Sequence, residues 1–210
     1  MATLKLGVLV SGSGTNLQAI LDATEDGSLD AEVRLVLSNV PGVKSLERAA
    51  AAGKSAVVLS HRDFTDREAF DKALVTTLRQ AGVEWVALAG FMRLLTPVFL
   101  RAFEGRIVNI HPALLPAFPG AHGQRDAFNY GVKVAGCTVH FVDEGVDSGP
   151  IIAQRAVPVL DDDTEATLAA RILQQEHQVY VEVLRLLAAG RVEIVPGSNG
   201  QRNRVRITKP

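Results

Sequence analysis

The chain has 210 residues, which is enough for one domain with a sizeable buried core, and no stretch of it reads as a linker. Hydrophobic residues make up 47% and charged residues 21%, as in ordinary globular proteins. The formal net charge of -1 gives no sign of a nucleic-acid or membrane partner. No apolar run approaches the roughly 18 residues of a membrane span and the N-terminus lacks a signal pattern, so a cytoplasmic location is expected.

The first half of the chain alternates between strand and helix patterns. Strands are expected at residues 4–10, 33–37, 57–59 and 85–89, and a fifth begins at Ile107. Helices are expected at residues 17–23, 45–52, 66–80 and 97–103, the last with Thr96 as its N-cap. This order implies parallel strands joined by right-handed crossovers.

The second half of the chain does not continue the alternation of strand and helix. A helix at residues 123–130 precedes strands at 134–142 and 151–157, whose connection is too short for a crossover helix, so these two strands are expected to be antiparallel. A long amphipathic helix at 164–189 follows, and residues 191–210 are predicted to be a loosely held tail. The fold class is therefore α/β: one domain over 1–190, with a Rossmann-like, open, mostly parallel sheet, helices on both faces and an antiparallel C-terminal strand pair.

A glycine-rich turn follows the first strand. Residues 11–16 carry glycines at 12 and 14, hydroxyls at Ser13 and Thr15, and then Asn16, at the start of a helix. Free backbone N–H groups and the helix dipole favour a site for a single phosphate here. The turn is neither a Walker loop nor a full dinucleotide fingerprint, because no Lys-Ser or Lys-Thr follows and Leu17 stands where the third small residue belongs. The alternative is a loop that only turns the chain.

A second candidate site lies where the strand from Ile107 ends. Asn109 and His111 are two positions apart, so they share one face of the strand, and three prolines at 112, 116 and 119 then force an irregular loop. An amide and a protonated imidazole are both donors that suit an oxyanion. Asp147, in a tight loop at a neighbouring strand end, is expected to raise the pKa of His111 and to accept protons. The alternative interpretation is that His111 has a structural role and that Asp143, Glu144 and Asp147 only form the turn.

Other polar residues give weaker signals. His122 and His140 are possible site residues, but the histidine spacings do not match a zinc motif, so no metal is expected. The single cysteine, Cys137, excludes a disulfide within the chain and is expected to be a buried, inert thiol. Arg67 and Glu176 lie on helices, where a solvated face is the default interpretation.

Four segments taken together resemble the phosphoribosylglycinamide formyltransferase family of folate-dependent enzymes. They are SGSGTNLQAI (11–20), LAGFMRLL (88–95), NIHPALLP (109–116) and DSGPI (147–151), in matching order and spacing. The resemblance extends from about residue 4 to residue 190. It implies that the formyl group of 10-formyltetrahydrofolate passes to the amino group of glycinamide ribonucleotide in purine biosynthesis, with no metal.

The resemblance also implies roles for individual residues. Asn109 and His111 would hold the oxyanion, and Asp147 would orient His111 and relay a proton. The implied ribonucleotide contacts are Ser13, Gly14, Thr15, Asn16, Gly120 and Glu176. The implied folate contacts are Arg67, Met92, Arg93, Leu94, Leu95, Asn109, Val142, Asp143 and Asp147.

Three alternatives remain at this stage. A formyltetrahydrofolate hydrolase usually carries an extra N-terminal domain, for which a first strand at Leu4 leaves no room. A methionyl-tRNA formyltransferase would need a further C-terminal domain and a more basic surface. A non-catalytic nucleotide-sensing module would use only the glycine-rich turn. We expect a monomer or a homodimer with two small-molecule substrates as its partners.

Overall fold

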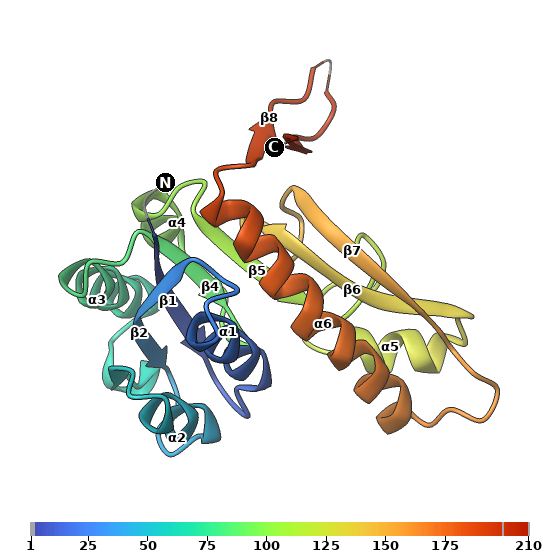
Figure 1. Ribbon diagram of the computed structural model, residues 1–210, viewed down its shortest axis with the longest axis horizontal. Coiled ribbons are helices and arrows are strands. Elements are labelled where there is room, and N and C mark those ends of the chain that lie inside the picture. Colours follow the sequence, from blue (N-terminus) through green and yellow to red (C-terminus); the bar gives the residue numbers. More distant parts are fainter. Residues whose placement is uncertain (1–2, 199, 210) are drawn as a thin grey trace.

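The computed structural model describes residues 3–198 and 200–209, and over these ranges seven strands form one central sheet (Figure 1). The spatial order is β3-β2-β1-β4-β5-β6-β7. The strands are β1 (Leu4–Val10), β2 (Ala31–Ser38), β3 (Ala56–Val58), β4 (Trp85–Leu88), β5 (Ile107–His111), β6 (Val134–Phe141) and β7 (Ile151–Pro158).

The direction of the strands follows the sequence pattern. β1 to β5 pair in parallel, which confirms the predicted strand direction. β6 is antiparallel to β7, as the short connection between them requires, and it is antiparallel to β5 as well. The sheet order reverses between β1 and β4, which is the position where open α/β sheets form a crevice for ligands.

Helices cover both faces of the sheet, as predicted. They are α1 (Thr15–Glu25), α2 (Lys44–Ala51), α3 (Arg67–Gln80), α4 (Pro97–Ala102), α5 (Gly123–Tyr130) and α6 (Glu165–Ala188), with a short 3₁₀ turn at His61–Asp63. On one face α1 and α6 lie side by side, and their apolar residues share a core with the sheet (Figure 1). On the other face α3 and α4 form a second core around Phe70, Leu74 and Phe99.

The helix ends show where sequence reasoning worked and where it did not. The carboxylate of Asp66 accepts the N–H of Ala69 at the start of α3, and Thr164 and Thr167 form a capping box at the start of α6. Thr96 occupies the N-cap position of α4, but its side chain makes no capping hydrogen bond. The predicted cap is therefore correct in position only.

The C-terminal segment differs from the prediction of a loosely held tail. It forms a two-stranded antiparallel sheet of β8 (Val192–Val195) and β9 (Arg204–Ile207). Val192, Ile194 and Val205 pack against the main core. Apolar and charged residues alternate along β9 and over the first three residues of β8, which is the period-2 pattern of a half-buried strand.

No helix in the described part of the chain is long and apolar enough to cross a membrane.

Candidate active site

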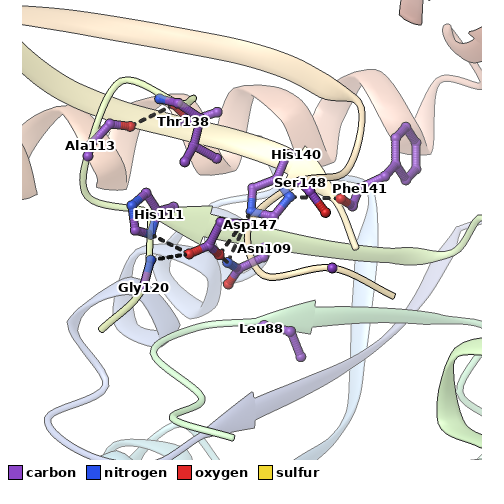
Figure 2. Close-up of polar contacts among 12 residues, drawn as sticks. Leu88, Asn109, His111, Ala113, Gly120, Thr138, His140, Phe141, Asp147 and Ser148 are labelled. Carbon is purple, nitrogen blue, oxygen red and sulfur yellow. Dashed lines mark hydrogen bonds and ion pairs between the residues drawn. The ribbon is translucent and has the colours of Figure 1, made fainter. Parts of the chain in front are cut away.

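Asp147 reaches across from the β6–β7 connection to the end of β5 (Figure 2). Its Oδ2 atom lies 3.3 Å from Nδ1 of His111 and accepts the backbone N–H of Gly120 at 2.8 Å. The other ring nitrogen of His111, Nε2, lies 2.8 Å from the carbonyl oxygen of Phe118. His111 is therefore held between the loop after β5 and the Asp147 loop, and Asp147 itself has a positive φ of 49°.

Asn109 and His140 complete this cluster (Figure 2). They are opposite one another on β5 and β6, and Nδ2 of Asn109 lies 3.2 Å from Nε2 of His140 and 3.5 Å from Oδ1 of Asp147. Nδ1 of His140 lies 2.7 Å from the carbonyl oxygen of Phe141. Nε2 of His140 also lies 3.6 Å from Oδ1 of Asp147, so this nitrogen faces both the Asn109 amide and the carboxylate. The ring thus orients the Asn109 amide.

Burial and the neighbouring polar groups shift the pKa of His111 in opposite directions, and the same is true of the pKa of Asp147. Burial lowers the pKa of His111, and it outweighs the Asp147 carboxylate and the Phe118 carbonyl, which raise it. Burial raises the pKa of Asp147, but the His140 ring, the Gly120 N–H and His111 outweigh it, so this pKa is lowered. The predicted effect of Asp147 on the pKa of His111 is present, but the net shift is downward because burial is the larger effect. Asp147 acts in the expected direction, yet a ring that is only 3% exposed loses more from burial.

A cavity of about 500 Å³ opens beside this cluster. All nine residues predicted to contact folate line it, namely Arg67, Met92, Arg93, Leu94, Leu95, Asn109, Val142, Asp143 and Asp147. His111, His140 and Gly120 line it as well. The structure therefore brings the implied catalytic and folate residues to one place, although they come from four separate segments.

The lining also includes residues that sequence reasoning did not assign. They are Leu88, Gly90, Phe91, Ile110, Pro112 and Ala121, while Glu144, Gly145 and Val146 belong to the 143–147 loop whose backbone the resemblance assigns to the folate. Most of them adjoin an assigned residue in the sequence, so the segments 88–95 and 143–147 carried the signal. The exposed His122 precedes α5 without capping it and is not among the described residues that line the cavity.

The glycine-rich turn lies at the carboxyl end of β1, the same end of the parallel sheet as His111 on β5. Gly14 has a φ of 70° and precedes α1, whose first N–H groups have no side-chain cap. A Cβ atom on Gly14 would lie 2.6 Å from Cβ of Ser45, so this position requires glycine. The side chain of Arg48 braces the turn, because its Nε donates a hydrogen bond of 2.9 Å to the carbonyl oxygen of Ser13.

Asn16 and Glu176 form a buried pair next to this turn. Nδ2 of Asn16 donates a hydrogen bond of 2.7 Å to Oε2 of Glu176, and both residues are less than a tenth exposed. Burial raises the pKa of Glu176, and the Asn16 hydrogen bond opposes this. Oδ1 of Asn16 and Oε1 of Glu176 have no hydrogen-bond partner among the described residues. Glu176 is thus not on a solvated face, which was the default interpretation, and the pair lies outside the folate-side cavity.

Within residues 3–198 and 200–209, no group of three or more His, Cys, Asp or Glu side chains is arranged to hold a metal ion. Cys137 is fully buried, and burial raises the pKa of its thiol to about 12, so this side chain is the inert thiol that the sequence predicted.

Comparison with known proteins fits this arrangement. The family described as Formyl transferase matches residues 4–184. The chain belongs to the formyl transferase family. This formyl transferase is 43% identical to the phosphoribosylglycinamide formyltransferase of Bacillus subtilis, over 87% of the chain and 94% of that relative. The resemblance drawn from the four sequence segments is therefore confirmed.

Two further comparisons extend the match. The solved structure of glycinamide ribonucleotide transformylase 1 from Symbiobacterium toebii has 51% sequence identity and a TM-score of 0.94, covering 99% of this formyl transferase and 95% of that chain. The trifunctional purine biosynthetic protein adenosine-3 of Drosophila melanogaster is 50% identical over 94% of the chain. The chain spans only 15% of that relative's length.

Proposed function

We propose that this formyl transferase moves the formyl group of 10-formyltetrahydrofolate to the amino group of glycinamide ribonucleotide, as in purine biosynthesis. The observation that carries the proposal is the meeting of Asn109, His111 and Asp147 in the cavity that the implied folate residues line. The names of relatives that match along nearly their whole length support glycinamide ribonucleotide as the acceptor and a formyl group as the group transferred.

The two substrates would occupy adjoining regions. The cavity of about 500 Å³ suits the pterin and benzoyl parts of the donor, since its wall contains apolar side chains and the guanidinium groups of Arg67 and Arg93. The phosphate of the ribonucleotide would accept N–H groups from residues 13–16 at the start of α1. The unpartnered oxygens of Asn16 and Glu176 would accept ribose hydroxyl protons, and Gly120 would adjoin the glycinamide.

Catalysis would depend on donors positioned before the reaction begins. The amine nitrogen attacks the formyl carbon, and negative charge develops on the formyl oxygen. One N–H of the Asn109 amide, which lies against the His140 ring, would turn from Asp147 to stabilise that charge. The reactants are held together, so the attack becomes effectively unimolecular.

The proton balance gives His111 its role. One proton leaves the amine and one reaches N10 of the folate as the bond from the formyl carbon to N10 breaks. Burial lowers the pKa of His111, so the ring is neutral near pH 7 and can take up the amine proton. The resulting imidazolium has N–H groups at both nitrogens, which match the two acceptors that face it, Asp147 and the Phe118 carbonyl. Asp147 would thus stabilise the imidazolium and relay its proton.

The deciding experiment compares consumption of 10-formyltetrahydrofolate with and without glycinamide ribonucleotide. We expect consumption of the donor only with the amine present, together with formation of formylglycinamide ribonucleotide detected by mass spectrometry. Equal consumption in water alone would instead identify a hydrolase. No consumption in either mixture would rule out the proposed reaction.

Two expectations from the sequence accompany this proposal and remain predictions. One is a cytoplasmic location, and the other is a monomer or a homodimer. Light scattering on the purified protein measures the second directly.

A further inference from the structure

One face of α3 holds the cavity wall formed by residues 92–95. Arg67 and Phe70 lie three positions apart on this helix, so they share a face. Nη2 of Arg67 donates a hydrogen bond of 3.0 Å to the carbonyl oxygen of Leu94. The guanidinium carbon of Arg93 lies 5.3 Å from the centre of the Phe70 ring. Two successive residues of the wall, Arg93 and Leu94, are therefore attached to α3.

Asp71 provides a third attachment from behind the wall. Its Oδ2 atom accepts the backbone N–H of Thr96 at 2.6 Å, and the two residues are 2% and 7% exposed. Asp71 is not among the described residues that line the cavity. Burial raises the pKa of this carboxyl, while hydrogen bonding from Thr96 and the charges of Arg67 and Arg93 oppose the shift.

Burying a carboxylate costs free energy unless other groups replace its lost hydration. For Asp71 these groups are the Thr96 N–H and the positive charges of Arg67 and Arg93. A charge-assisted hydrogen bond is shorter and stronger than a neutral one, so it defines the position of the backbone at Thr96 tightly. Residues 92–95 lie directly before that point and carry no regular secondary structure of their own. Their position consequently depends on contacts with α3.

We infer that Asp71 is a positioning residue for the formyl donor: through the Thr96 N–H and beside Arg67 and Arg93, it sets the cavity wall of residues 92–95 without contacting the donor. The inference deepens the proposed function and rests on it, because the cavity is taken as the site of the folate. Loss of Asp71 should weaken donor binding selectively. The phosphate-side residues lie on other elements, so binding of the ribonucleotide should not change.

The test substitutes Asp71 and measures steady-state kinetics for both substrates. Asp71→Leu removes the acceptor at similar size, and we expect KM for the formyl donor to rise about tenfold while kcat and KM for the ribonucleotide stay near wild type. Asp71→Asn retains an oxygen that can accept from Thr96 and should restore most of the donor affinity. Hydrogen exchange should accelerate at the amides of residues 92–96 in Asp71→Leu. If that protein does not fold, the shorter polar Asp71→Ser carries the same expectation.

Asp163 supplies a matched control. Asp163 is half-buried as a residue, but its carboxylate is covered: it pairs with Arg171 and accepts the backbone N–H of Leu160 at 2.7 Å, away from the cavity. Asp163→Leu should lower stability without changing KM for the donor. An equal rise in donor KM for both variants, or normal donor KM and exchange in Asp71→Leu, would overturn the inference. A wild-type protein that transfers no formyl group would refute the proposed function instead, and the exchange measurement would still test the role of Asp71 in holding the wall.

Discussion

Two histidines of the site have different roles because their nitrogen atoms face different partners. Both ring nitrogens of His111 face hydrogen-bond acceptors that match an imidazolium, while burial lowers its pKa and favours the neutral ring in the free protein. Nδ1 of His140 faces the Phe141 carbonyl, and its Nε2 lies 3.2 Å from Nδ2 of Asn109 and 3.6 Å from Oδ1 of Asp147. The first can therefore gain and lose a proton during the reaction, while the second orients Asn109.

Asp147→Asn tests this division at the level of one residue. The carboxylate raises the pKa of His111 against burial, so its removal should lower that pKa further below the ordinary value, as followed by NMR titration of the imidazole. Turnover should fall by about 10²–10³ because the imidazolium loses its counter-ion. Affinity for the ribonucleotide, measured by calorimetry, should stay near wild type. A mutant with nearly normal turnover would mean that Asp147 is not part of the catalytic group.

Among the elements, the turn between β1 and α1 is shaped by its surroundings as much as by its own residues. Gly14 is in the left-handed region, and the start of α2 lies so close that only a hydrogen fits in place of a side chain. Ser45 donates its backbone N–H to the carbonyl oxygen of Gly12, and Arg48 donates to Ser13. α2 therefore supports the turn that would hold the phosphate.

Gly14→Ala should displace this turn. The new Cβ would meet both Cα and Cβ of Ser45 within 3 Å, so we expect a loss of about 1–3 kcal/mol in stability and a clear rise in KM for the ribonucleotide, with donor KM unchanged. Gly27→Ala is the control, because Gly27 has a similar φ of 75° but no atom within 4 Å of an added Cβ. It should lower the melting temperature without affecting either KM. Normal ribonucleotide kinetics in Gly14→Ala would argue against a phosphate site in the turn.

At the scale of the whole molecule, the described residues that line the cavity all precede the C-terminal hairpin. The hairpin covers part of the core with three half-buried side chains and contacts the 143–150 loop through Arg202, whose Nη1 donates to the carbonyl oxygen of Ser148 at 3.3 Å. It therefore contributes to the stability of the fold more than to the site. The division into a domain of 1–190 and a C-terminal segment remains a prediction.

Removal of residues 191–210 tests that division. The remaining chain should fold and transfer formyl groups, because the sheet and the cavity are intact. Loss of the apolar contacts of Val192, Ile194 and Val205 should cost about 1–3 kcal/mol, which lowers the melting temperature by roughly 2–10 °C. Circular dichroism follows the melting, and the transfer assay follows function. A truncated chain that cannot fold would make the hairpin an integral part of the domain.

Local patterns were enough to identify most elements of this protein and some of its candidate site residues, while Arg67, Glu176 and the folate contacts were assigned only through the family resemblance. The alternation of strand and helix, the turn at 11–16, and the Asn109 and His111 pair all depend on residues that are close in sequence. The hairpin of residues 192–207 was overlooked, although its alternating pattern is also local.

Only the tertiary structure brought Asp147 to within 3.3 Å of His111, set His140 against Asn109, and buried Asp71 and Glu176 behind the substrate regions. It also decided the direction of the His111 pKa. Burial and Coulomb interactions depend on distances between segments that are far apart in the chain, and no local pattern encodes those distances.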